Sequence, residues 1–130
     1  DASTTVKGKV QLATAAVTQG GTNGTDAVTS TGLAATMLGG VGQAYTDVTG
    51  SRAAGTNYTN TKGRPIAVQV KTPIATNGRL QPTVDGVALP ESHDSVTGGS
   101  KAYVSFMVPN GKVYSVAVPI GSIEKWVELR

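Results

Sequence analysis

The chain has 130 residues, of which 38% are hydrophobic and 15% charged, with a formal net charge of +3 and no cysteine. The absence of cysteine excludes disulfides and thiolate chemistry, and the lack of a basic run argues against nucleic-acid binding. Plentiful Val, Thr, Gly and Ser favour β-structure with many turns over disorder or helices, and no apolar run reaches transmembrane length.

The composition changes about a third of the way along the chain. Residues 1–38 contain almost no charge and no aromatic side chain, whereas residues 43–130 contain every aromatic residue of the chain. Residues 39–42 read Gly-Gly-Val-Gly, which is typical of a flexible hinge. We therefore expect a leader, a hinge and a head over these three ranges. Because the chain begins at Asp1 and not at Met, we also expect it to be a piece of a longer protein.

The leader has apolar residues but lacks the pattern of a stable helix or strand. Residues 11–18 and 25–35 can each form short helical turns, but both are shorter than the roughly 12–15 residues that an isolated helix needs in water. The leader therefore needs a neighbouring surface to bury its apolar side chains. These are Val10, Leu12, Val17, Val28 and Leu33.

The first part of the head predicts short strands separated by turns. We expect strands over residues 45–49, 56–60 and 64–72, the last with its apolar residues on one face. An Asn-Gly pair at 77–78 marks a turn. Within residues 80–89, Asp85-Gly86 predicts a two-residue hairpin loop.

Residues 101–119 predict a hairpin closed by Asn110-Gly111, the pair preferred in a type I′ turn. In that register Val108 faces Val113, and both faces of the hairpin carry large apolar groups. A hairpin with one solvated face would alternate apolar and polar residues. We therefore expect a second sheet to cover one face and another subunit to cover the other. A last strand is expected within residues 122–130.

Short strands with turn signals about every ten residues predict an all-β fold, with an antiparallel β-sandwich-like head. A head of this size buries only somewhat over about 60% of its unfolded surface, so association with other copies would add needed stability.

Catalytic groups are few. Ser92, His93 and Asp94 are adjacent in sequence, and adjacent residues rarely converge into a catalytic triad. One histidine cannot build a closed zinc site within a single chain, although a site shared across a symmetry axis stays open. We expect Glu124 and Glu128 to be surface charges, and we expect no catalytic residue, cofactor or metal ligand within one chain.

Binding is therefore the favoured activity. Most of the few aromatic residues should be structural, which leaves polar loops at 76–79 and 91–101 as the exposed surface. From their expected exposure, the candidate receptor-binding residues are Asn77, Arg79, Ser92, His93 and Asp94.

The leader resembles the repeat of tailed-bacteriophage fibre proteins, which runs G-x-V-Q-L-A-T, then a Gly/Thr-rich loop, then A-V-T-P-x-x-L. Ser30 stands where that family usually has Pro. The matching residues are Gly8, Val10, Gln11, Leu12, Ala13, Thr14, Ala27, Val28, Thr29 and Leu33.

The head resembles the C-terminal tip of the same fibres. Residues 45–66 match an aromatic followed by D/N-V-T-x-S-R-x-x-G-T-x-Y-T-N-x-T-G-x-P-I, although Tyr45 stands where Trp is common and Lys62 where Thr is common. Residues 104–116 and the terminal Trp-Val-Glu-Leu-Arg resemble the closing hairpin and last strand of that family.

The resemblance implies a homotrimer at the distal end of a tail fibre on a virion, outside the cell. The implied partners are two further copies of the chain and a bacterial surface receptor, either lipopolysaccharide, another glycan or an outer-membrane protein. Neither nucleic acid nor membrane insertion is expected. Three leaders side by side would bury their apolar residues against each other.

Two other functions stay open. One is a tail spike that depolymerises the surface polysaccharide it binds, which needs two carboxylates. The candidates for that pair are Asp47, Asp85, Glu91 and Asp94. The other is a purely structural connector that binds no host cell.

Overall fold

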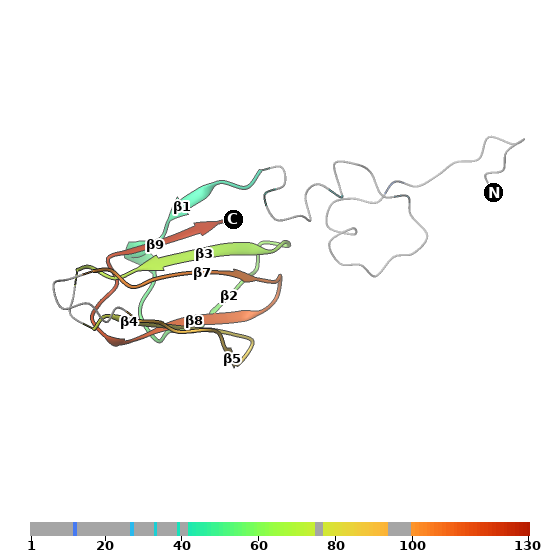
Figure 1. The fold of residues 1–130 in the computed structure, drawn as a ribbon. Helices are drawn as coiled ribbons and strands as arrows, with labels where there is room; N and C mark the ends of the chain where they lie inside the picture. The colour runs from blue at the N-terminus through green and yellow to red at the C-terminus, as the bar shows by residue number, and fades with distance from the viewer. Residues whose placement is uncertain are drawn as a thin grey trace, which may run out of the picture.

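Nine strands and one short 3₁₀ turn make up the head in the computed structural model, which describes Leu12, Ala27, Leu33, Gly39 and residues 42–74, 77–93 and 100–130 (Figure 1). In chain order these elements are β1 (Tyr45–Asp47), η1 (Thr49–Ser51), β2 (Tyr58–Thr59), β3 (Ile66–Lys71), β4 (Arg79–Val84), β5 (Val87–Ala88), β6 (Ser92–His93), β7 (Tyr103–Val108), β8 (Val113–Ile120) and β9 (Lys125–Leu129).

The strands form two antiparallel sheets. One has the order β1-β9-β3-β7, and the other has the order β2-β8-β4-β5, with β6 also paired to β4. Figure 1 shows the two sheets as two layers, one above the other. The prediction of an all-β fold with antiparallel strands is confirmed.

One hydrophobic core lies between the sheets, because each long strand turns alternate residues inward. In β3 the residues Ile66, Val68 and Val70 are buried while their neighbours are partly exposed, as the period of two in the sequence predicts. Trp126 from β9 and Tyr114 from β8 are the largest fully buried side chains. The core therefore draws on both sheets.

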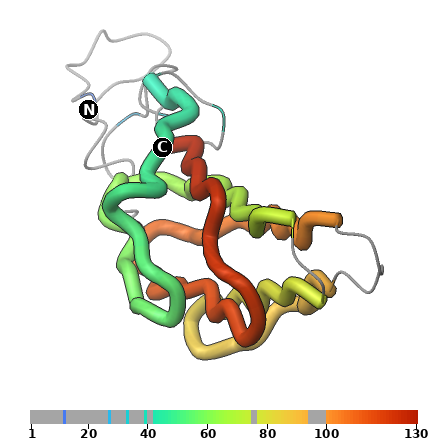
Figure 2. Tube along the Cα trace, turned by 90° about the vertical axis from the view of Figure 1, so that its left-hand side faces the viewer, coloured from blue at the N-terminus to red at the C-terminus, as the bar shows by residue number. Residues whose placement is uncertain are grey.

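The first and last segments of the head lie at the same end. Ala44 and Arg130 exchange backbone hydrogen bonds of 3.2 Å, and the C-terminal segment runs beside the segment that leads into β1 (Figure 2). We call this the proximal end. The opposite end, formed by residues 71–74, 77–79, 92–93, 100–103 and 120–125, is the distal end. In Figure 1 it lies on the left.

The predicted loop at Asp85-Gly86 is confirmed. It joins β4 to β5, and both residues have positive φ, 52° for Asp85 and 80° for Gly86. A type I′ turn requires positive φ at both central positions, which Asp and Gly tolerate better than other residues.

The predicted hairpin over residues 101–119 is wrong. β7 pairs with β3, whereas β8 pairs with β2 and β4, so the two strands lie in different sheets and Val108 pairs with Ile66 and not with Val113. Asn110 has no positive φ, and Gly111 has a φ of 77°, which is the pattern of a type II turn. Each strand buries one face; the other face is exposed on β7 and exposed or partly exposed on β8 in a single chain.

The prediction that Glu128 is a surface charge is also wrong, because its side chain is fully buried. Its carboxylate accepts hydrogen bonds from Arg52 Nε at 2.9 Å, the Tyr114 hydroxyl at 2.6 Å, Trp126 Nε1 at 3.2 Å and Arg130 Nη1 at 3.2 Å. A buried carboxylate is tolerated only when it is paired and hydrogen-bonded. These bonds tie β9 of one sheet to β8 of the other and to the segment after η1.

The protonation of this cluster follows from its contacts. Burial alone would raise the pKa of Glu128, but hydrogen bonds from Arg52 and Tyr114 outweigh it and hold that pKa below its ordinary value. Burial, followed by the hydrogen bond to the Glu128 carboxylate, raises the pKa of Tyr114. Glu128 is therefore a carboxylate and Tyr114 a phenol at neutral pH.

The predicted leader and hinge lie largely outside the described residues. Of the predicted interface residues, Leu12 is 62% exposed and Leu33 is 54% exposed in the single chain. Within the part of the chain that the structure describes, no helix has the length and hydrophobicity that spanning a membrane requires. The other predicted interface residues fall outside the described part: Val10, Val17 and Val28.

Candidate functional site

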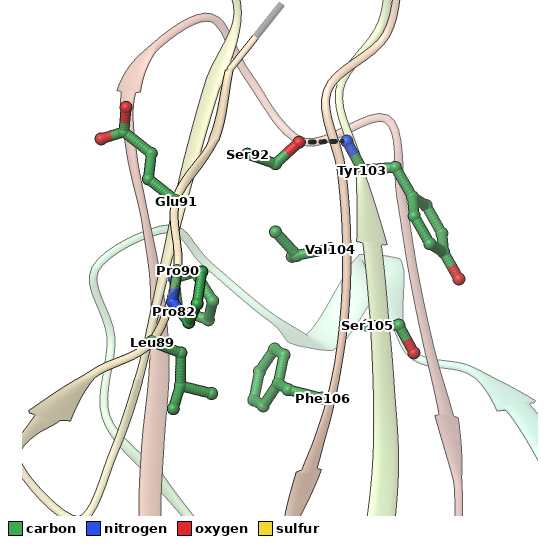
Figure 3. Close-up of a pocket in the computed structure, with 9 residues that line it drawn as sticks. All are labelled: Pro82, Leu89, Pro90, Glu91, Ser92, Tyr103, Val104, Ser105 and Phe106. Carbon is green, nitrogen blue, oxygen red and sulfur yellow. Dashed lines mark hydrogen bonds between the residues drawn. The ribbon is translucent and has the colours of Figure 1, made fainter.

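A groove of about 360 Å³ opens between the edges of the two sheets along one side of the head (Figure 3). Strand β7 forms one bank, from which Val104 and Phe106 point into the groove. The facing bank is formed by Pro82 of β4 and by Leu89 and Pro90, between β5 and β6, which lie opposite Phe106. The groove walls are therefore mostly apolar along this length.

The distal end of the groove is polar. Glu91 and Ser92 line it, and the Tyr103 backbone N–H donates a hydrogen bond of 3.2 Å to Ser92 Oγ across the groove (Figure 3). The Tyr103 ring lies on the other side of β7, away from the groove. A ligand in the groove would meet the Ser92 hydroxyl at one end and hydrocarbon at the other, while the Glu91 carboxylate points away from β7 (Figure 3).

Strand β7 also offers free backbone groups along this groove. Thr72 N–H donates to Ala102 O at 3.0 Å. By the same register, Val104, Phe106 and Val108 are the residues of β7 whose backbone groups bond to β3. Because antiparallel pairing uses alternate residues, the N–H and C=O groups of Ser105 and Met107 point to the opposite edge. Among the described strands, none pairs with that edge. These groups are available to a bound molecule.

Three of the five predicted receptor-binding residues come together at the distal end. The short strand β6 pairs with the start of β4, which places His93 opposite Arg79 and Ser92 opposite Leu80. Arg79 Nη1 lies 3.7 Å from Glu91 Oε1, an ion pair that is partly exposed. Strand pairing thus joins residues that are more than ten positions apart in the sequence.

The other two predicted residues are placed differently. Asn77 lies in the turn before β4, is exposed and has a φ of 59°, a left-handed conformation that Asn tolerates better than most residues. It belongs to the distal end, but within the described part of the chain no hydrogen bond or ion pair joins it to Arg79 or His93. Asp94 lies outside the described residues.

Sequence reasoning missed a second distal feature, a hollow of about 150 Å³ on the outer face of the β1-β9-β3-β7 sheet. Tyr103, Lys71 and Lys125 line it together with Gln69. The Glu124 carboxylate forms ion pairs with Lys71 at 3.3 Å and with Lys101 at 2.6 Å, and Asp47 pairs with Lys125, so three ammonium groups face two carboxylates around the hollow. The sequence did contain a signal for this feature. Residues 103–108 alternate with a period of two, so Tyr103 points outward if Val104 points inward.

The described residues of the distal end carry polar, apolar and aromatic groups. Among them, no three His, Asp or Glu side chains gather as a metal site would require. Glu91 is the carboxylate that lines the groove. The head thus offers hydrogen bonds, apolar contact and an aromatic ring, which are means of binding.

Comparison with protein families, with curated proteins and with solved structures finds no match for this chain.

Proposed function

We propose that this chain is the receptor-binding tip of a bacteriophage tail fibre, or of a related tail-like particle, and that it acts without catalysis. The observation that carries the proposal is the layout of the head. The chain enters at the proximal end, while Arg79, Ser92 and His93 meet at the distal end beside an open groove. A fibre that presents its distal end to a cell would present these groups first.

The tip would be a homotrimer, as the resemblance of the leader and head to fibre proteins implies. Three copies place three sites on one end, and several fibres on one particle multiply them. Avidity then gives firm attachment from modest single-site affinity. The net charge of +3 favours approach to an anionic bacterial surface.

The receptor would be lipopolysaccharide, another surface glycan or an outer-membrane protein. Arg79, Ser92 and His93 supply hydrogen-bond donors and acceptors at the distal end. The apolar bank around Phe106 and Leu89 supplies a surface for hydrocarbon. Glycans and protein loops both present such a mixture of polar and apolar groups.

Binding of the labelled fragment to a panel of bacterial strains tests this proposal. We expect some strains to bind it, and we expect Arg79→Ala and His93→Ala to weaken binding by tenfold or so each, because each removes one polar contact of about 1.4 kcal/mol. Thr83→Ala, on β4 of the same sheet but beside the proximal turn, is the matched control. Variants at Arg79 and His93 that bind every strain as the unchanged chain does would refute the assignment of this site.

The same preparation separates the alternatives. Competition by purified lipopolysaccharide indicates a glycan, and loss of binding after protease treatment of the cells indicates a protein receptor. Shortening of the surface polysaccharide, abolished by Glu91→Gln, would favour the depolymerising tail spike instead. Absence of binding to all strains would favour the structural connector.

A further inference from the structure

The outer face of the β1-β9-β3-β7 sheet carries one line of apolar residues at its proximal end. Strand register sets them side by side, because Tyr45 pairs with Leu129, Leu129 with Ala67, and Ala67 with Met107. We call these four residues the apolar row. Tyr45 is 63% exposed and Met107 is 60% exposed in the single chain. The row spans all four strands of the sheet.

No charged side chain interrupts the apolar row. The nearest charge on this face, Asp47, lies in the next row and is already bonded to Lys125. Along β7 the row ends at an edge that is six residues long and has neither a charge nor a proline. Soluble proteins usually protect long edge strands with such residues or cover them. We therefore expect another surface to cover the apolar row and the edge of β7.

The other sheet lacks such a row on its outer face. On β8 the outward Val113 is 39% exposed, but its partner on β2 is Thr59. The outward residues in the middle of the sheet are Gln81 and Thr83 on β4 and, opposite them, Ala117 and Ser115 on β8. These are small or polar side chains, as on a solvated sheet face. An exposed apolar row across the strands is therefore a feature of one of the two outer faces of the head.

We propose that the apolar row is the surface through which the head of one copy packs against other copies of the same chain. Around a three-fold axis the same row from each of three copies can meet at the axis, where an uncharged row brings no like charges together. The occupant is also indicated by continuity along the chain, since Leu12 and Leu33 of the leader are likewise exposed in a single copy. A contact that begins in the leader would continue into the head at Tyr45, three residues after Gly42.

This inference rests on the proposed trimer and adds that the head, and not the leader alone, holds it together. A contact through the apolar row leaves the distal end free, because the row is confined to the proximal half of the face. In the distal row of the same face, Lys125 and Lys71 lie side by side with Tyr103 next to Lys71. Assembly would then occupy the proximal end of the head, and recognition its distal end.

The solution mass of the full 130-residue chain by light scattering tests the inference, with the variants Met107→Lys and Tyr45→Lys. The unchanged chain is expected near three times 13.1 kDa. Each lysine would place an unpaired ammonium in the contact, so we expect dissociation at concentrations about 100-fold higher than for the unchanged chain. Both positions are exposed in one copy, so the fold should persist, which circular dichroism and its melting curve check.

Two controls make the result specific. Val87→Lys changes a residue of the other sheet that is 64% exposed, and it should keep the full mass. Met107→Leu keeps the apolar side chain and should also keep it. The inference is overturned if folded Met107→Lys and Tyr45→Lys retain the full mass, if the unchanged chain is a monomer, or if Val87→Lys dissociates equally.

The outcome is independent of receptor binding. A chain that assembles through the row but binds no bacterial strain would refute the receptor function and leave the inference standing. A chain that binds cells and keeps its mass in both row variants would refute the inference alone. In that case a receptor or another part of the fibre covers the row.

Discussion

The two sheets of the head have similar inner faces and different outer faces. Inward, both contribute large buried side chains, such as Trp126 from one sheet and Tyr114 from the other. Outward, one sheet carries the apolar row and the other carries residues such as Thr83 and Ser115. Inner faces must be apolar in any two-layer fold, so they reveal little about function. The outer faces do not have to be apolar, so the difference between them indicates what each side of the molecule contacts.

The largest expected effect tests whether the inner faces act as one unit. Glu128→Ala removes the carboxylate that joins β9 to Tyr114 and leaves the Arg52 guanidinium without its partner. We expect a loss of about 3–5 kcal/mol in the free energy of unfolding, since an uncompensated buried charge remains. Urea denaturation measures it. Glu124→Ala, at an exposed ion pair, should change stability by less than about 1 kcal/mol; equal losses in both would contradict the account.

Acid is expected to weaken the same junction. The folded pKa of Glu128 lies below its ordinary value, so its ionised form stabilises the fold fully above the unfolded pKa of about 4.3. That contribution is lost as the pH falls through the folded pKa. Denaturation midpoints measured from pH 7 downward should therefore fall below about pH 4. In Glu128→Gln this decline should be shallower, and an unchanged slope would show that other carboxylates cause it.

A smaller effect distinguishes an inward tyrosine from an outward one. The Tyr114 hydroxyl donates to Glu128 Oε1 at 2.6 Å, so Tyr114→Phe should cost about 1–2 kcal/mol of stability. Tyr103 is 50% exposed on the outer face, and Tyr103→Phe should stay within about 0.5 kcal/mol. Thermal melts of the two variants give the comparison. If both melt alike, the buried hydroxyl has no special role.

The smallest effect concerns the outer face of the second sheet. Thr83→Lys adds a charge to a face that we expect to be solvated, so both stability and solution mass should stay unchanged, within about 0.5 kcal/mol for stability. Ala67→Lys makes the equivalent change within the apolar row and should lower the solution mass. A fall in mass with Thr83→Lys would show that both faces are covered, and the contrast between them would fail.

The sequence by itself determined the local features of this protein. Alternation with a period of two assigned Ile66, Val68 and Val70 to the core, because successive side chains of a strand point to opposite faces. The Asp85-Gly86 loop followed from the conformational freedom of its two residues. These features depend on neighbours within a few positions, so the sequence determines them directly.

Only the tertiary structure decided how the strands combine. Val108 and Val113 flank one turn, yet the turn leads from one sheet to the other, because pairing with β3 and β4 outweighs local pairing. Glu128 is buried because Arg52, 76 positions away, meets it there. The candidate site likewise depends on the pairing of Arg79 with His93. Such contacts join distant segments, and their stability comes from the whole fold and not from local preference.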